Sequence, residues 1–255
     1  MFVPKILPKA KRDAVRRLLG RGLSDYEIAR RVDVNRGTVQ NWRLKGIPEP
    51  VEQPAFIPKE WADDRRAAYA YLLGLYLGDG YVGTHPRTFS LIIACDRGHT
   101  DLVAECRCVV DLFAAKPSAL QIVGETKSVR VVSYGQVWPK LFPQHGPGKK
   151  YQRKIELASW QRSITERFPH QLLRGLVHPD GSRCFNTFKV TLKTGPKEYS
   201  YPRYFFTNYS TDIQGIFTDT CDQLGIRWSR SNWRNISIAH RDSVAHLDSF
   251  IGLKS

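Results

Sequence analysis

The sequence predicts an α+β fold in which two pseudo-symmetric units, each with the element order αββαββα, follow a small all-α domain. Three observations support this fold class. An apolar segment ending in Asp-Gly occurs twice, a similar succession of helix and strand patterns follows each copy, and the first 46 residues form a separate helical pattern. A repeat of this length indicates a duplicated unit. We divide the sequence into residues 1–46, a Pro-rich linker at 47–60, a first unit at 61–160 and a second unit at 161–255.

Residues 9–45 predict three short helices. Ser24 and Glu27 have the spacing of a capping box before the second helix. Asn35 can cap the third helix, in which Val39 and Trp42 face inward at helical spacing. The pattern resembles the helix-turn-helix of resolvases and homeodomains, which implies a DNA-binding domain. The exposed face of the third helix then presents side chains that can hydrogen-bond base edges in a major groove: Arg36, Thr38, Gln40, Asn41 and Arg43.

The linker contains four prolines, which exclude a helix and favour an extended, semi-rigid spacer. At a rise of ~3.1 Å per residue in polyproline II geometry, it spans about 40 Å. The front domain can therefore contact DNA beside, or at some distance from, the site held by the rest of the chain.

The duplicated segment is LLGLYLGDG at 72–80 and LRGLVHPDG at 173–181. Residues at i, i+3 and i+4 share a helix face, so each copy predicts an apolar helix that ends at its aspartate, Asp79 or Asp180. Gly74 and Gly175 occupy equivalent positions, where the missing Cβ lets two backbones approach closely. The sequence thus predicts two helices packed side by side with their carboxylates at the same end.

Strand and helix patterns follow each copy in the same order. In the first unit a strand begins at Tyr81, and the further elements are expected at 88–95, 99–113, 120–123, 128–133 and 136–142. In the second unit they are expected at 185–192, 199–207, 211–224, 226–231, 235–239 and 242–251. Between the units, residues 147–150 predict an exposed basic loop.

Both Asp-Gly segments resemble the signature of the LAGLIDADG homing endonuclease family, over about residues 61–255. Two departures exist. Leu77 and His178 stand where the family name has its first acid, and Pro179 fills a usually small position and can tilt the last turn. The resemblance implies that the paired helices form the interface between the units and place Asp79 and Asp180 at the cleavage centre.

Phosphodiester hydrolysis needs an activated water and stabilisation of the leaving oxygen, and divalent metals held by converging acids supply both. Two adjacent carboxylates also repel each other without a cation. Mg²⁺ is the expected ion, with Mn²⁺ as an alternative. The metal-binding candidates are Asp79, Asp180 and the residues before them, Gly78 and Pro179. The resemblance further implies a basic residue near each centre, so the catalytic candidates are Asp79, Asp180, Lys149, Lys150 and Lys254.

The net charge favours a polyanionic partner. The chain has 39 Lys and Arg against 24 Asp and Glu, a balance of +15, and residues 1–46 alone contribute 12 basic and 4 acidic residues. The hairpins of the second unit are also rich in basic residues, and a β-ribbon with such residues on one face can lie in a major groove. The DNA-binding candidates there are Arg183, Lys189, Lys193, Arg203, Arg227, Arg230, Arg234 and Arg241.

These observations predict a site-specific, magnesium-dependent double-strand DNA endonuclease acting as a monomer. The N-terminus does not resemble a signal peptide, and no run approaches the ~20 apolar residues of a membrane span. We therefore expect no membrane association and a cytoplasmic, intracellular and nucleoid-associated protein. The alternative is a non-cleaving DNA-binding transcription regulator or RNA maturase on the same fold. Two retained acids favour the nuclease, because a binder has no need for adjacent acids beside phosphate.

Overall fold

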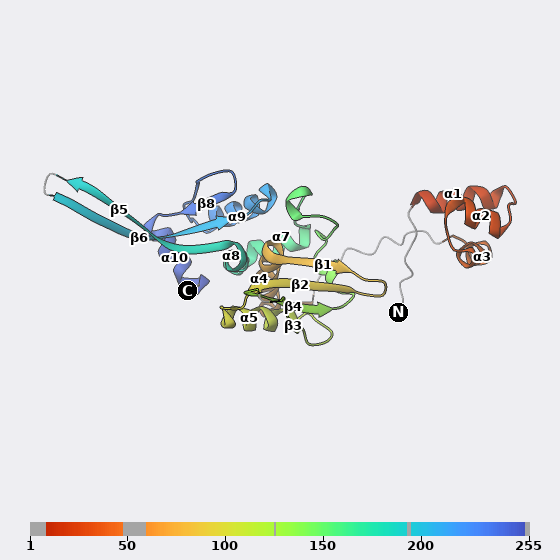
Figure 1. Cartoon of the computed structure of the whole chain (residues 1–255), viewed down its shortest axis with the longest axis horizontal. Helices are drawn as coiled ribbons and strands as arrows, with labels where there is room; N and C mark the ends of the chain where they lie inside the picture. The colour runs from red at the N-terminus through yellow and green to blue at the C-terminus, as the bar shows by residue number, and fades with distance from the viewer. Residues whose placement is uncertain (1–8, 48–59, 125, 193–194, 253–255) are drawn as a thin grey trace. The chain divides into compact units, whose positions relative to one another are not determined.

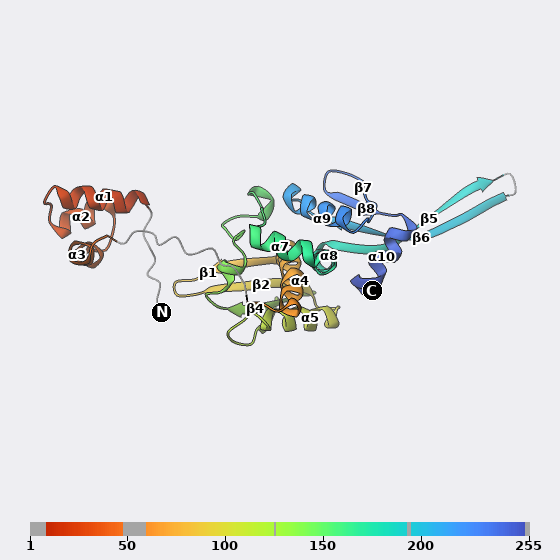
Figure 2. The same cartoon turned by 180° about the vertical axis from the view of Figure 1, so that it is seen from behind.

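A computed structural model describes residues 9–47, 60–124, 126–192 and 195–252 of the chain (Figures 1 and 2). They fall into two compact parts, which we call the front part, Met1–Ala55, and the main part, Phe56–Ser255. Three predictions lie outside the described residues: most of the linker, at 48–59, and the candidate site residues Lys193 and Lys254.

The front part consists of three helices, α1 (Lys9–Gly20), α2 (Asp25–Val32) and α3 (Arg36–Lys45). Both predicted caps are present: Ser24 and Glu27 form the capping box of α2, and Asn35 accepts a hydrogen bond from the Gly37 amide at 2.8 Å. These caps satisfy backbone amides that a helix start leaves without partners. The small core of this part consists of Val15, Ile28, Val39 and Trp42.

The main part contains the predicted order αββαββα twice. The first unit has α4 (Asp63–Asp79), β1 (Gly80–Thr84), β2 (Phe89–Asp96), α5 (Thr100–Asp111), β3 (Ala119–Ile122), β4 (Ser128–Tyr134) and α6 (Trp138–Leu141). The second has α8 (Pro169–Asp180), β5 (Gly181–Leu192), β6 (Gly195–Thr207), α9 (Thr211–Gln223), β7 (Ser229–Arg230), β8 (Asn235–Ile238) and α10 (Arg241–Ile251). The four-stranded antiparallel sheets have equivalent orders, β1-β2-β4-β3 and β5-β6-β8-β7. The predicted duplication is therefore present in the fold.

Three local predictions differ from the structure. The connection between the units contains a short 3₁₀ helix, η1 (Lys150–Gln152), and a helix, α7 (Ser159–Arg167), that the sequence patterns did not reveal. Strand β5 begins at Gly181 rather than at 185, because the chain leaves α8 directly in extended conformation. Strand β7 is only two residues long.

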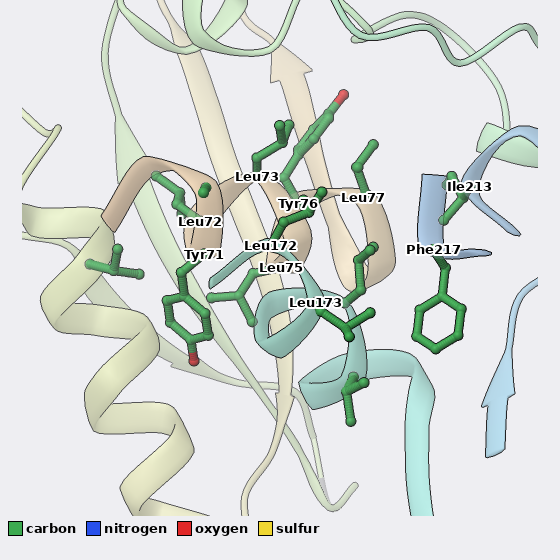
Figure 3. Packing of buried hydrophobic residues seen from close by; sticks show 14 of the residues in the cluster. Tyr71, Leu72, Leu73, Leu75, Tyr76, Leu77, Leu172, Leu173, Ile213 and Phe217 are labelled. Atoms are coloured by element: carbon green, nitrogen blue, oxygen red, sulfur yellow. The ribbon is translucent and has the colours of Figure 1, made fainter. Parts of the chain in front are cut away.

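Apolar side chains of α4 and α8, among them Leu72, Leu75 and Leu173, lie in one buried cluster (Figure 3). The backbones of the two helices meet at Gly74 and Gly175. A Cβ added to Gly74 would lie 2.5 Å from the Gly175 carbonyl carbon and 2.7 Å from the Leu172 oxygen, which is closer than real Cβ contacts come. The predicted close approach of the two helices is thus confirmed. From Tyr69 to Leu77 every residue of α4 is buried, because this helix lies between α8 and its own sheet.

Two further features concern the whole described structure. No helix in it is long and apolar enough to cross a membrane. All five cysteines are free, and two of them, Cys106 and Cys221, are buried.

The glycine contact predicts that two Gly→Ala substitutions in helices change the free energy of unfolding very differently. Gly74→Ala should lower the free energy of unfolding by about 1–3 kcal/mol, because its methyl group would overlap the backbone of α8. Gly215→Ala in α9 is the matched control: an added Cβ there meets nothing within 4 Å. The control should gain up to about 1 kcal/mol from helix propensity. Denaturant unfolding measures both, and equal effects would contradict the proposed helix contact.

Candidate active site at the ends of the paired helices

Helices α4 and α8 end at Asp79 and Asp180, and a glycine follows each. The Gly80 amide bonds back to the Tyr76 carbonyl, and the Gly181 amide to that of Val177. A Cβ on Gly80 would lie 2.6 Å from the Tyr76 Cα, and one on Gly181 2.6 Å from the Val177 oxygen. Glycine is therefore required directly after each acid, because only glycine lets the chain turn so closely past the helix end into the next strand.

The ends of the two helices adjoin each other. A Cβ on Gly78 would lie 2.8 Å from the Pro179 Cβ and 3.1 Å from the Asp180 Oδ2. The residue that precedes the first acid is therefore in contact with the second acid. Helix α8 continues through Pro179 to Asp180. The proline removes the N–H that would donate to the Gly175 carbonyl, and its ring fills the space beside Gly78.

Lys150 lies beside both acids, which corrects the prediction that this loop residue would be exposed; Lys149 is exposed, as predicted. The three N–H groups of the Lys150 Nζ are shared among four carbonyls within hydrogen-bond distance, those of Tyr76 (2.7 Å), Leu77 (2.7 Å), Gly80 (2.9 Å) and Gly78. A cation at a helix C-terminus interacts favourably with the last carbonyls of the helix. Burial lowers the pKa of Lys150 to about 8, and the charges of Asp180 and Asp79 oppose this shift.

Asn208 holds the second acid, and the sequence patterns did not single it out for this. Its Nδ2 donates to the Asp180 Oδ2 at 2.7 Å, and its Oδ1 accepts from the Ser210 amide at 2.8 Å. The Gln214 Nε2 donates to the Asn208 carbonyl at 2.6 Å, and Arg230 in turn donates to Gln214. The asparagine side chain is therefore fixed on both its amide and its carbonyl end. Asn208 follows β6, and it reaches Asp180 because β6 pairs with β5, the strand that begins directly after this acid.

The first acid has different surroundings. Asp79 lines a cleft of about 200 Å³, together with Pro179 and the thiols of Cys95 and Cys106. The hydrogen bond between these thiols lowers the pKa of Cys95 and raises that of Cys106. The two acids of the duplicated motif are therefore equivalent in backbone position and different in environment.

His178 stands where the family name has an acid, and it is buried in a hydrogen-bond chain. The Tyr71 hydroxyl lies 2.8 Å from the His178 Nδ1, and the His178 Nε2 lies 3.0 Å from the Ile251 carbonyl. Because a carbonyl only accepts, the proton of a neutral ring is on Nε2, and Nδ1 accepts from the tyrosine. The imidazole thus joins α4, α8 and the end of α10 just before the second acid.

The residues at the helix ends fit a hard divalent cation. Aspartate carboxylates and backbone carbonyls are the oxygen ligands that Mg²⁺ prefers. Within the described ranges, no group of three or more His, Cys, Asp or Glu side chains is arranged to hold a metal ion. An ion at Asp79 and Asp180 would therefore complete its coordination with water and phosphate oxygens. The Gly78 carbonyl, predicted to help bind metal, already accepts from Lys150.

The predicted base-reading face of α3 is largely accessible. Arg36, Gln40 and Asn41 are exposed and Thr38 is half-buried. Arg43 is exposed too, but it has partners in the chain: its Nε lies 2.7 Å from the Asp25 Oδ1, and its Nη2 donates to the Leu23 carbonyl at 2.6 Å. This guanidinium links α3 to the start of α2.

Most of the predicted DNA-binding arginines of the second unit have partners within the chain. Arg183 pairs with Asp248 at 2.8 Å, and Arg203 donates to Ser237. Arg227 contacts His240, Arg230 contacts Gln214, and Arg234 contacts the Tyr209 hydroxyl. Lys189 is exposed and lies 3.5 Å from Glu198, and Arg241 is exposed at the start of α10.

The candidates on β5 and β6 do not share one sheet face. Directly opposite residues of an antiparallel pair point to the same side, and neighbours along a strand alternate. The register pairs Arg183 with Tyr204 and Cys184 with Arg203. Arg183 and Lys189 therefore share the face of the buried Tyr204, and Arg203 lies on the other.

No family model matches the chain, and no curated protein matches it. Several solved structures do. A variant of I-DmoI in complex with its target DNA and in the presence of Mn aligns with a TM-score of 0.50 and 16% identity over 75% of this chain and 97% of that chain. A second I-DmoI variant, in complex with its target DNA in the presence of Mg, aligns with a TM-score of 0.50 and 16% identity over 75% of this chain and 99% of that chain. The LAGLIDADG meganuclease I-AabMI, bound to uncleaved DNA, aligns with a TM-score of 0.47 and 12% identity over 71% of this chain and 82% of that chain. The chain therefore has the LAGLIDADG fold, as its sequence predicted.

The position of Lys150 predicts a structural effect that its exposed neighbour lacks. Lys150→Met should lower the free energy of unfolding by about 1.5–3 kcal/mol, because it removes a charged donor from the carbonyls at the end of α4. Lys149→Met is the control and should change it by less than about 0.5 kcal/mol. Guanidinium unfolding measures both. A stabilised Lys150→Met protein would mean that burial of the ammonium costs more than its hydrogen bonds contribute.

Proposed function

We propose that the chain is a site-specific endonuclease that hydrolyses both strands of double-stranded DNA with divalent metal ions, using one acid from each unit. The observation that supports it most is the position of Asp79 and Asp180 at the adjoining ends of two glycine-packed helices, beside the half-buried Lys150. The fold is that of proteins solved in complex with target DNA and Mn or Mg.

Asp79 and Asp180 are the proposed metal ligands, with the carbonyls of Gly78 and Pro179 as further oxygen donors. Mg²⁺ is the proposed ion and Mn²⁺ an alternative. When bound, such ions supply an activated water and charge stabilisation at the scissile phosphate. The chain's own part is to hold the two carboxylates in position, which the helix packing and the Asn208 amide do.

Lys150 is the proposed basic residue of the centre. Its ammonium fixes the end of α4 and offsets the charge of both acids, which reduces their repulsion and that of an approaching phosphate. Lys149 is exposed beside it and can contact a phosphate directly. The assignment of Lys254 stays a prediction, since that residue lies outside the described ranges.

The front part is the proposed second DNA-binding element, with a helix-turn-helix whose third helix, α3, reads base edges. Its exposed polar residues and its balance of 12 basic to 4 acidic residues support this role. On the main part, Lys189 and Arg241 are proposed to contact phosphates, with the paired arginines contributing to the positive potential. We propose that the protein acts as a monomer, in the cytoplasm and on nucleoid DNA.

A non-cleaving DNA-binding protein, a transcription regulator or an RNA maturase, is the second candidate. One observation favours it: Lys150 already donates to the Gly78 carbonyl, which the metal site would otherwise use. The two acids favour the nuclease, because carboxylates beside a phosphate weaken binding unless a metal lies between them.

Replacing both acids separates the two candidates. With a target selected from a randomised duplex library and Mg²⁺ present, the unmodified protein should cut both strands, and Asp79→Asn Asp180→Asn should not cut above buffer level. The double variant should bind the target as well or better, because two negative charges are removed near the phosphates. Asp101→Asn, an exposed acid on α5, is the control and should still cut.

A chelator should abolish cleavage by the unmodified protein. Cutting by the double variant would refute the assigned roles, and tight specific binding without cutting by the unmodified protein would favour the regulator.

The front part makes a separate prediction about binding. The double variant Arg36→Ala Gln40→Ala should weaken binding to the selected target by about 1–3 kcal/mol per lost base contact. The slope of the logarithm of the binding constant against the logarithm of the salt concentration should fall in magnitude by about 1 per lost phosphate contact. Arg17→Ala on α1 removes a charge elsewhere in the same part and should leave sequence preference unchanged. Competition binding at several salt concentrations measures both, and unchanged preference in the double variant would exclude base reading by α3.

A further inference from the structure

The β5–β6 hairpin extends away from the rest of its unit (Figures 1 and 2). Its strands are 12 and 13 residues long, whereas β1 of the first unit has five. Only Tyr204–Thr207 of β6 pair with β8, so the hairpin from Arg203 to its turn is a two-stranded ribbon. The duplicated units therefore differ most in the strands that leave directly after the two acids.

Both faces of the outer ribbon are exposed, and we call the face with the apolar cluster the open face. On the opposite face, Tyr204 and Phe206 are buried next to the sheet and Arg183 pairs with Asp248 of α10. Further out, that face carries the exposed Phe185 and Lys189. By the strand register, the open face consists of Asn186, Phe188, Val190, Lys197, Tyr199, Tyr201 and Arg203.

The open face is apolar in its outer part. Tyr201 is 40%, Phe188 39% and Val190 37% exposed, so a large share of each side chain contacts solvent. The rings of Phe188 and Tyr199 stack with centroids 5.6 Å apart, and Phe188 meets Tyr201 edge-on at 5.5 Å. Cross-strand aromatic pairs stabilise a hairpin, but they do not require this much apolar surface to face water.

Charge indicates what kind of partner fits this face. Residues 181–207 contain five Lys or Arg and one Glu. The Arg203 guanidinium lies over the Phe205 ring at 4.4 Å, and the Lys197 ammonium over the Tyr199 ring at 5.2 Å. Apolar rings flanked by cations suit a major groove, where a two-stranded ribbon fits, cations meet phosphates and apolar side chains contact the thymine methyl group.

We infer that the open face reads thymine methyl groups on the side of the target that the second unit contacts, with Phe188, Tyr201 and Val190 as the specificity-determining residues. This inference rests on the proposed DNA function. A strand rises about 3.3 Å per residue, so the open-face positions from Asn186 to Val190, with the residues paired to them on β6, lie roughly 17–30 Å from Gly181. At about 3.4 Å per base pair, this corresponds to about five to nine base pairs from the cut.

The first unit has no ribbon of this length within the described residues, although Tyr81 and Tyr134 of its sheet are 49% and 52% exposed. Strand β1 ends at Thr84, four residues after Gly80, and so reaches only about 13 Å, or about four base pairs. The target should therefore be read asymmetrically, with methyl contacts far from the cut on one side only.

The test uses the full-length Asp79→Asn Asp180→Asn protein, which is expected to bind without cutting, and its selected duplex. Thymines on either side of the cut are replaced one at a time by deoxyuridine, which lacks only the methyl group. On one side of the cut, at about five to nine base pairs from it, each replacement that removes a contacted methyl group should lower the protein's affinity for the duplex about fourfold. At the same distance on the other side it should not change.

Variants link this effect to the ribbon. In Phe188→Ala the deoxyuridine effect should disappear at one position, because the methyl group has lost its partner. Phe185→Ala is the matched control: Phe185 is 64% exposed on the same strand but on the opposite face, and the fourfold effect should persist. Val190→Ala provides a second test outside the ring cluster, should loss of Phe188 unfold the hairpin.

Specific binding with equal affinity for thymine and deoxyuridine at every position would overturn the inference and leave the proposed endonuclease intact. A deoxyuridine effect that survives both Phe188→Ala and Val190→Ala would also overturn it. Absence of specific binding to any duplex, together with no cutting by the unmodified protein, would instead refute the proposed function itself.

Discussion

The contact between Gly74 and Gly175 is the constraint on which the site depends. Two helices approach this closely only when both lack a Cβ at the crossing, and the backbone of each then occupies the space a side chain would need. This crossing aligns the ends of α4 and α8, so that Gly78 lies against Pro179 and Asp180. The acids are thus positioned by backbone packing inside a buried core, which resists small displacements more than loop contacts would.

Bringing two carboxylates together creates an electrostatic cost that the chain partly offsets itself. Lys150 contributes a buried ammonium that contacts the end of α4 and interacts with both acids. A buried charge without such partners would be unfavourable, and burial does lower its pKa. The chain therefore has a cation near the acids before any metal ion, and metal ions would have to share the Gly78 carbonyl with it.

The duplication left the two units equivalent in topology and different in detail. Asp180 is held by the Asn208 amide, whereas Asp79 borders a cleft with two thiols. The second unit also has the long aromatic ribbon. Basic residues, which the sequence suggested as a single DNA-binding face, are instead divided between both faces of the second sheet, and several arginines pair within the chain. Net charge predicts the class of partner, but not which side chains contact it.

The sequence alone determined the duplication, the element order within each unit, the glycine crossing and the two acids. These follow from local periodicity, from the turn chemistry of Asp-Gly and from the absence of a Cβ, all of which can be seen within a few residues. The capped helices of the front part were predictable for the same reason. Strand β5 was placed too late because extended residues directly after a helix give no alternating pattern of their own.

Only the tertiary structure decided the roles of Lys150, Asn208 and the arginines. Lys150 is 71 residues from Asp79 in the sequence, and Asn208 is 28 from Asp180. Whether such side chains point to the acids, to solvent or to a partner such as Asp248 depends on strand register and helix packing. Residue type and spacing do not specify these, since a one-residue change of register moves a side chain to the other face of a sheet.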